Sequence, residues 1–203
     1  MALVKKSSLP PSVCNVGDKA FKNCVSLTTL DLPPHITVLG DECFNNCAKL
    51  QHVNLPNTVR TIGESAFIHC RSLTSIELPP LVTEIGNCAF GSCTKLVSVT
   101  LPLNATMGND VFQRCASLST VTWMPGTRRV QGFSGCTGLK TLSIPIGVTV
   151  IEDNAFCACT KLVSVDIPPT VTHIGEAAFA KCSALKSIHV PGGVTELTSA
   201  VFK

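Results

Sequence analysis

Cysteines are the residues of this chain with the most varied chemistry, since they can form disulfides, bind metal ions or act as nucleophiles. The 203-residue sequence contains twelve, and eight of them recur at steps of 21–23 residues: Cys24, Cys47, Cys70, Cys93, Cys115, Cys136, Cys159 and Cys182. One slot filled eight times favours a buried structural role, because free cysteine packs as a small apolar residue. Neighbouring strands about 4.8 Å apart would permit disulfides within such a row. An equivalent row offers no unique pairing, so we expect thiols.

Metal binding and catalysis have weak candidates. Two pairs of cysteines have the spacing of half a zinc site: Cys43 with Cys47, and Cys157 with Cys159. A strong zinc signal has two such pairs at characteristic spacing, often with histidine. None of the histidines lies in a recognisable nucleophile arrangement, and the sequence has no P-loop, dinucleotide fingerprint or His-Glu-x-x-His motif. We therefore expect no metal, no cofactor and no enzymatic activity.

The recurring cysteines belong to a repeated unit of about 23 residues. Phenylalanine stands three residues before each of the eight, and leucine three residues after it, as in Phe21, Cys24 and Leu27. Further apolar residues follow, such as Leu30 and Leu32, and proline comes next in seven of the eight units. One unit cannot bury its own phenylalanine and leucine, whereas stacked units share a continuous core. The repeat predicts a solenoid.

Each part of the unit predicts a local structure. Leu30 and Leu32 alternate with Thr29 and Asp31, which is the period of two of a β-strand. A following proline ends the strand, and a glycine such as Gly40 marks the next tight corner. Asp, Asn or Glu stands six residues before the cysteine in seven of the eight units, as is typical of the start of a helix. We therefore predict a short helical turn from the corner to the cysteine.

The motif Ile174-Gly-Glu-Ala-Ala-Phe-Ala-Lys-Cys-Ser-Ala-Leu185 resembles the BspA-like class of leucine-rich repeats. The resemblance covers nearly the whole chain in eight in-phase copies. It implies an α/β repeat fold, a leucine-rich-repeat solenoid with a curved parallel β-sheet on one face and short helical turns on the other. Such arrays occur in surface adhesins and in many proteins of microbial eukaryotes. The fifth unit departs from the pattern around Pro125-Gly-Thr-Arg-Arg129, where Trp123 takes an apolar strand slot that favours the core.

The repeat boundaries predict a single solenoid domain over residues 1–203, with a partial first unit (1–13), about eight units and a truncated last unit (192–203). Val4 and Leu9 lie in phase with the apolar strand positions of the next unit, and Phe202 stands where another Phe-x-x-Cys would begin. Solenoids normally end in polar caps. We see none after Phe202, so we expect a segment of a longer array, or an exposed apolar end that supports self-association.

Composition restricts the classes of partner. Charged residues are 14% of the chain and the net charge is +3, which is too small to favour nucleic acid. No apolar run approaches the roughly 18 residues of a membrane helix, and the N-terminal apolar run is too short for a secretion signal. We expect no membrane insertion and a cytoplasmic location by default, or the cell surface if the chain belongs to a longer secreted protein.

The strand pattern also predicts which side chains face solvent. They form two columns: Thr29, Asp31, His52, Asn54, Ser75, Glu77, Ser98, Thr100, Thr120, Thr122, Thr141, Ser143, Ser164, Asp166, Ser187 and His189. Eight strands about 4.8 Å apart give a face roughly 34 Å long, enough for a standard protein interface. We expect a non-catalytic binding module that takes an unknown protein or glycan on this concave face. A surface adhesin or a purely structural array is the alternative, and a merely solvated β face has the same pattern.

Overall fold

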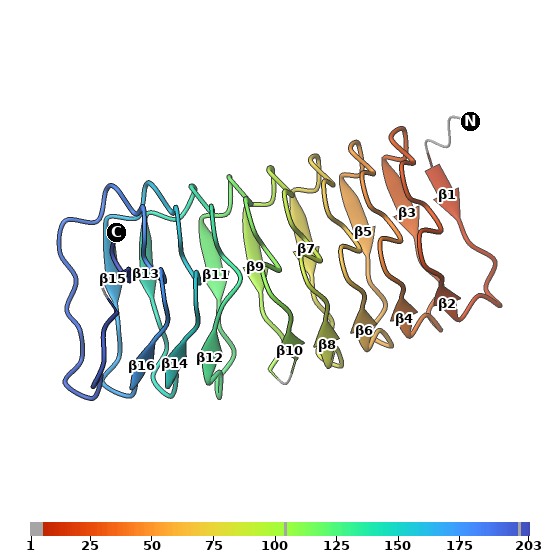
Figure 1. Cartoon of the computed structure of the whole chain (residues 1–203). Helices are drawn as coiled ribbons and strands as arrows, with labels where there is room; N and C mark the ends of the chain where they lie inside the picture. Colours follow the sequence, from red (N-terminus) through yellow and green to blue (C-terminus); the bar gives the residue numbers. More distant parts are fainter. Residues whose placement is uncertain (1–5, 104, 199) are drawn as a thin grey trace.

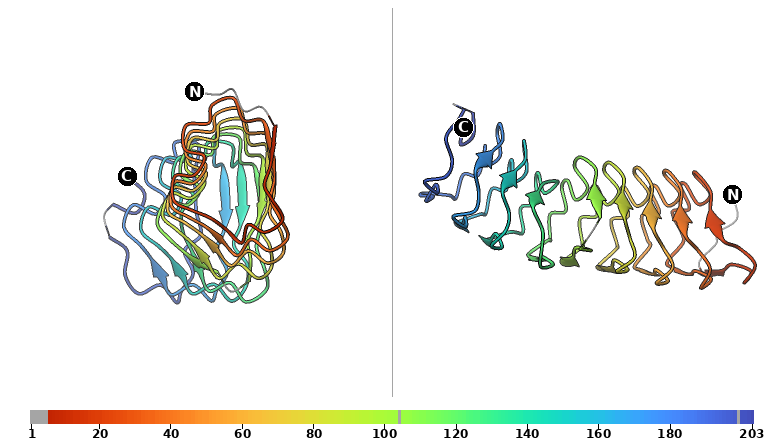
Figure 2. Two further views of the ribbon diagram at one scale, coloured as in Figure 1. Left: turned by 90° about the vertical axis from the view of Figure 1, so that its right-hand side faces the viewer. Right: turned by 90° about the horizontal axis from the view of Figure 1, so that it is seen from below.

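The computed structural model describes residues 6–103, 105–198 and 200–203. The chain winds into successive coils that stack side by side from one terminus to the other (Figure 1). The stack follows a curved path, as its end-on view and its view from below show (Figure 2). Two rows of short parallel strands run along it. The predicted parallel solenoid is therefore confirmed.

The first row holds the predicted three-residue strands; from β3 onward their outer positions are exposed, except for the half-buried Thr29, and their middle residue points inward. Its members are β1 (Lys6–Ser8), β3 (Thr29–Asp31), β5 (His52–Asn54), β7 (Ser75–Glu77), β9 (Ser98–Thr100), β11 (Thr120–Thr122), β13 (Thr141–Ser143) and β15 (Ser164–Asp166). They pair in parallel as β1-β3-β5, β7-β9-β11 and β13-β15. β1 is the strand of the predicted partial unit, and Leu9 after it packs against the core, while Val4 lies outside the described residues.

The second row is a parallel ladder of two-residue strands that we did not predict. It comprises β2 (Asn15–Val16), β4 (Val38–Leu39), β6 (Thr61–Ile62), β8 (Glu84–Ile85), β10 (Thr106–Met107), β12 (Arg129–Val130), β14 (Val150–Ile151) and β16 (His173–Ile174). β2 to β10 form one five-stranded sheet, and β12, β14 and β16 form another. In most of these strands the second residue is buried, so the repeated valine-to-isoleucine stretch supplies a second wall of the core.

Columns of identical side chains fill the interior, as predicted. All nine phenylalanines stack on their neighbours, with consecutive ring centroids 5.0–6.1 Å apart. This spacing lies within the favourable range for offset aromatic pairs. Seven column cysteines, from Cys47 to Cys182, donate from Sγ to the phenylalanine carbonyl of the preceding coil at 3.1–3.3 Å. The slot therefore combines a small apolar side chain with a hydrogen-bond donor, which explains the choice of cysteine.

The segments between the corner and the cysteine column are turns, so the predicted helical turns are wrong. In residues 40–47, Glu42 and Asn46 have φ angles of 53° and 58°, whereas every residue of an α-helix has a negative φ. The N–H groups of Glu42, Phe44 and Asn46 donate to carbonyl groups of the next coil at 2.8–2.9 Å. A helix would direct these N–H groups to carbonyls of its own segment. The amides here join neighbouring coils instead.

The acidic and amide side chains before the cysteines have a corresponding role. Asp18 Oδ1 accepts the backbone N–H of Asp41, its equivalent one coil later, at 2.9 Å. Asp41 Oδ1 in turn accepts the N–H of Glu64 at 2.8 Å. These carboxylates therefore bridge coils, and the predicted capping of a helix start is wrong because there is no helix to cap among the described residues.

Candidate functional site

The exposed face of the first row carries most of the predicted binding residues. Fourteen of the sixteen lie on β3, β5, β7, β9, β11, β13 and β15, and all fourteen are exposed except Thr29, which is half-buried. Ser187 and His189 are exposed on the last coil but lie outside any strand. The predicted eight-strand face is therefore wrong at this end, where the described strand pairing stops at β15. We call the fourteen residues the strand face.

The strand face differs in chemistry along its length. Its acidic residues, Asp31, Glu77 and Asp166, lie toward its two ends, and the middle strands β9 and β11 present only serine and threonine. A shallow hollow of about 360 Å³ lies over β3, β5 and β7. Ser143 Oγ approaches Asp166 Oδ2 at 3.5 Å across β13 and β15. The middle of the face thus offers hydroxyl groups without formal charge.

The cysteines of the interior are poorly suited to chemistry. All twelve cysteines are free. Burial raises the pKa of Cys47, Cys115 and Cys159 to about 12 and that of Cys182 to about 11. Because the thiolate is the reactive and metal-binding form, these thiols are protonated at neutral pH and inert. Within residues 6–103, 105–198 and 200–203, no three His, Cys, Asp or Glu side chains gather as a metal site would require.

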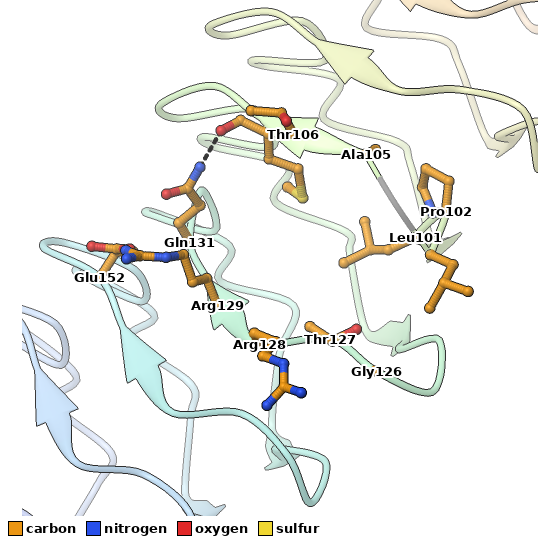
Figure 3. Close-up of a pocket in the computed structure, with 12 residues that line it drawn as sticks. Leu101, Pro102, Ala105, Thr106, Gly126, Thr127, Arg128, Arg129, Gln131 and Glu152 are labelled. Atoms are coloured by element: carbon orange, nitrogen blue, oxygen red, sulfur yellow. Dashed lines mark hydrogen bonds and ion pairs between the residues drawn. The ribbon is translucent and has the colours of Figure 1, made fainter.

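A groove interrupts the second row where β10 and β12 fail to pair. Its volume is about 430 Å³. Residues 101–103 and 105–107 line one side, residues 126–129 and Gln131 line the other, and Glu152 lies at its end (Figure 3). Figure 1 shows β10 and β12 set wider apart than the neighbouring pairs of this row. We call this space the strand groove. It lies in the region where the repeat pattern is lost. The sequence therefore indicated an irregular coil here but did not predict a cavity.

Glycine at the end of a second-row strand explains why the other coils approach closely. A Cβ on Gly63 would lie 2.6 Å from the backbone carbon of Gly40, and one on Gly108 would lie 2.5 Å from the backbone nitrogen of Asn87. Real Cβ atoms are not found so close. The glycine N–H groups can therefore reach the preceding coil, as Gly108 does to the carbonyl of Ile85 at 2.7 Å.

Gln131 occupies the same corner in the β11–β12 coil. The glycines at this corner leave no room for a Cβ, whereas Gln131 has one, and here β12 and β10 are not paired. The side chain partly bridges the space, since Gln131 Nε2 donates to the carbonyl of Met107 and, at 3.1 Å, to that of Gly108. Replacement of the corner glycine by Gln131 marks this coil in the sequence, but it would not by itself have predicted the groove.

Glu152 also stands at a corner position, yet β14 pairs with β12. In the preceding coil the segment between the corner and the phenylalanine is shorter than in the regular coils. Only Gly132, with a φ of 89°, lies between Gln131 and Phe133. The shorter segment leaves room for the Glu152 side chain, which pairs with Arg129.

Trp123 joins the core only in part. Its side chain is half-buried and meets the ring of Phe133 edge-on, with the centroids 5.6 Å apart and the planes at 74°. The prediction of a core position is therefore close to the observed one.

None of the described residues belongs to a helix that is long and apolar enough to cross a membrane.

The sequence matches the family described as the BspA type leucine rich repeat region, in six copies over residues 14–132 and 127–203. None of the curated proteins compared with it matches. Among solved structures, it is similar to a leucine-rich repeat protein from Bacteroides ovatus ATCC 8483, with 31% identity and a TM-score of 0.89. That match covers 97% of this chain and 54% of the other, so the chain spans about half the length of the B. ovatus protein.

Two further solved structures are similar. The T. pallidum leucine rich repeat protein has 30% identity and a TM-score of 0.69, covering 91% of this chain and 79% of its own. A leucine rich cell surface protein from Faecalibacterium prausnitzii A2-165 has 29% identity and a TM-score of 0.59, covering 98% of this chain and 72% of its own.

Proposed function

The chain belongs to the BspA-type leucine-rich repeat family, and from this premise we propose that it is a non-catalytic module that binds a protein or a glycan through its strand face. Leucine-rich repeat proteins are typically non-catalytic, and solenoids commonly use an extended sheet as a binding platform. The binding surface that we propose is the strand face.

The observation that carries this proposal is the regular display of short polar side chains. Ser98, Thr100, Thr120 and Thr122 stand exposed in two columns on paired strands. Parallel strands hold such columns about 4.8 Å apart. Serine and threonine hydroxyls both donate and accept hydrogen bonds, and they have little side-chain entropy to lose on binding. An ordered hydroxyl array of this kind suits hydrogen-bonding partners such as glycan hydroxyls or an exposed backbone.

A surface adhesin is the second candidate. The similar protein from F. prausnitzii is described as a leucine rich cell surface protein. At a cell surface, the strand face would contact a ligand outside the cell, and the exposed ring of Phe202 would support self-association. This ring is 44% exposed and stacks on Phe179 with the centroids 6.1 Å apart.

The test introduces two bulky cations into the middle of the strand face. Thr100→Arg combined with Thr122→Arg places two bulky side chains among the hydroxyl groups and leaves the core unchanged. We expect this variant to lose binding to the protein or glycan that the unmodified chain binds. Binding is first measured on an array of defined glycans. Proteins that the unmodified chain captures are identified and purified one by one, and the binding of each is then measured again. Circular dichroism with urea titration verifies that the variant is folded.

The matched control places the same two cations outside this face. Ser117 and Thr160 are exposed turn residues, so the Ser117→Arg and Thr160→Arg pair has the same added charge. Binding that survives the strand-face pair as well as the control pair would remove the case for this surface. An adhesin is distinguished by adhesion of coated beads to host or bacterial cells, which only the strand-face pair should lower.

A further inference from the structure

We propose that the strand groove binds an extended acidic peptide segment of a partner protein as an added β-strand between β10 and β12. This site lies in the second row, apart from the strand face, so the two proposals can fail independently.

Two strand edges that would pair in a regular coil face the groove. On the β10 edge Gln131 Nε2 donates to the carbonyls of Met107 and Gly108, so an added strand displaces this side chain. On one side of the groove Gly108 donates its N–H to Ile85 at 2.7 Å, and on the other side Glu152 donates to Val130 at 2.9 Å. Gln131 is the equivalent residue of the β11–β12 coil, and none of the described residues accepts its backbone N–H. No backbone hydrogen bond joins β10 to β12 in the described chain. Open edges of this kind accept an added strand.

The separation of β10 and β12 is local to this side of the solenoid. The rings of Phe112 and Phe133, on the interior of the same coils, stay stacked with their centroids 5.4 Å apart. The first row also stays paired from β9 to β11. The two coils therefore diverge like a wedge toward the second row (Figure 1). A groove volume of about 430 Å³ falls in the range of peptide and small-molecule sites, about 300–1,000 Å³.

The side chains of the groove specify the kind of strand. Leu101 is buried, Leu103 is 46% exposed and Met107 is half-buried, so the β10 side is apolar. On the opposite side Arg129 pairs with Glu152, while Arg128 is exposed at the rim and has no carboxylate partner among the described residues (Figure 3). In an added strand that alternates aliphatic and acidic residues, the aliphatic side chains would lie on the leucines and the acidic side chains near Arg128.

The probe is a fluorescein-labelled six-residue peptide of alternating valine and glutamate, acetylated and amidated at its ends. Fluorescence anisotropy with the whole chain should show saturable binding. Amide resonances of Met107, Arg129 and Gln131 should shift on titration. A peptide with alternate backbone amides N-methylated should bind at least about tenfold more weakly, because it loses the hydrogen bonds of an added strand.

A charge reversal at the rim gives the matched comparison. Arg128→Glu should weaken binding of the peptide by about tenfold at low salt. Arg60→Glu is the control, since Arg60 is exposed at the equivalent position of a regular coil, where no groove interrupts the row. Both residues are exposed, so we expect both variants to fold.

Four results would overturn the proposal. They are absence of binding, equal affinity for the N-methylated peptide, displacement by glutarate at the concentration where the peptide binds, and loss of peptide binding in the strand-face pair Thr100→Arg and Thr122→Arg. The third result would identify a simple carboxylate site, and the fourth would assign the peptide to the strand face.

Discussion

In the coils from β2 to β10, the second row forms one continuous ladder, and a glycine stands at each corner that the next coil approaches. The β11–β12 coil has Gln131 at that corner, and its ladder to β10 is broken. The interior does not register this difference, because Phe112, Phe133 and Phe156 remain stacked through the same region. From this we infer that interior columns hold the stack together, while the corner residue and the length of the segment it meets in the preceding coil together decide whether the outer ladder closes.

The largest expected effect concerns the cysteine column, which is common to both regions. Burial raises the pKa of the thiols to about 11 for Cys182 and about 12 for Cys115 and Cys159, above the ordinary value of about 8.5. The unfolded chain therefore loses these protons first. The contribution of the protonated thiols to the free energy of unfolding is complete below about pH 8.5 and falls as the pH rises toward 11–12. By pH 10 each buried thiol should lower the free energy of unfolding by about 2 kcal/mol, measured by urea titration under reducing conditions.

The column's continuity can be tested within this pH series. Cys93→Ser, in a regular coil, and Cys136→Ser, after the groove, each remove one titrating thiol and should reduce the loss between pH 8 and pH 10 by about 2 kcal/mol. A smaller reduction for Cys136 than for Cys93 would show that the interior changes at the groove.

The next effect compares phenylalanines in the two regions. Phe67 and Phe133 are both fully buried, so replacing either by alanine should cost about 3–5 kcal/mol through the cavity left behind. Urea titration gives both values, with His52→Ala on the strand face as the control that changes stability by less than about 0.5 kcal/mol. Equal losses for His52 and Phe67 would contradict the assignment of inner and outer sides. A much smaller loss for Phe133 would separate the two regions.

The smallest effect concerns the corner itself. Gly63→Ala forces a Cβ against the backbone of Gly40 and Asp41, and should cost about 1–3 kcal/mol by overpacking. Gln131→Ala removes only the side-chain hydrogen bonds across the groove and should cost about 0.5–1.5 kcal/mol. Hydrogen exchange provides the second measurement, since the amide of Gln131 should exchange faster than that of Gly108, which is hydrogen-bonded. Equal protection of the two amides would mean that the ladder is closed.

Residue types and spacing predicted the repeat, the first-row strands and their inward and outward sides. These follow from apolar periodicity, which any stacked unit must satisfy. The same reasoning placed helical turns where the structure has two left-handed residues, as at Glu42 and Asn46, because acidic residues before a turn are equally typical of a helix start. Of the fourteen residues of the strand face, all were predicted correctly as strand positions and all but Thr29 as exposed ones. The strand groove was not, although its neighbourhood was recognised as irregular.

What the sequence by itself determined is the interior, since phenylalanine, cysteine and leucine in one repeated phase can be buried only by stacking. The tertiary structure alone decided where the backbone hydrogen bonds go. Those between coils join residues 20–24 positions apart, and each forms only if two coils approach closely enough. A Cβ at the corner does not decide this alone, since the ladder breaks at Gln131 but stays closed at Glu152, and the difference becomes visible only when the neighbouring coil is in place.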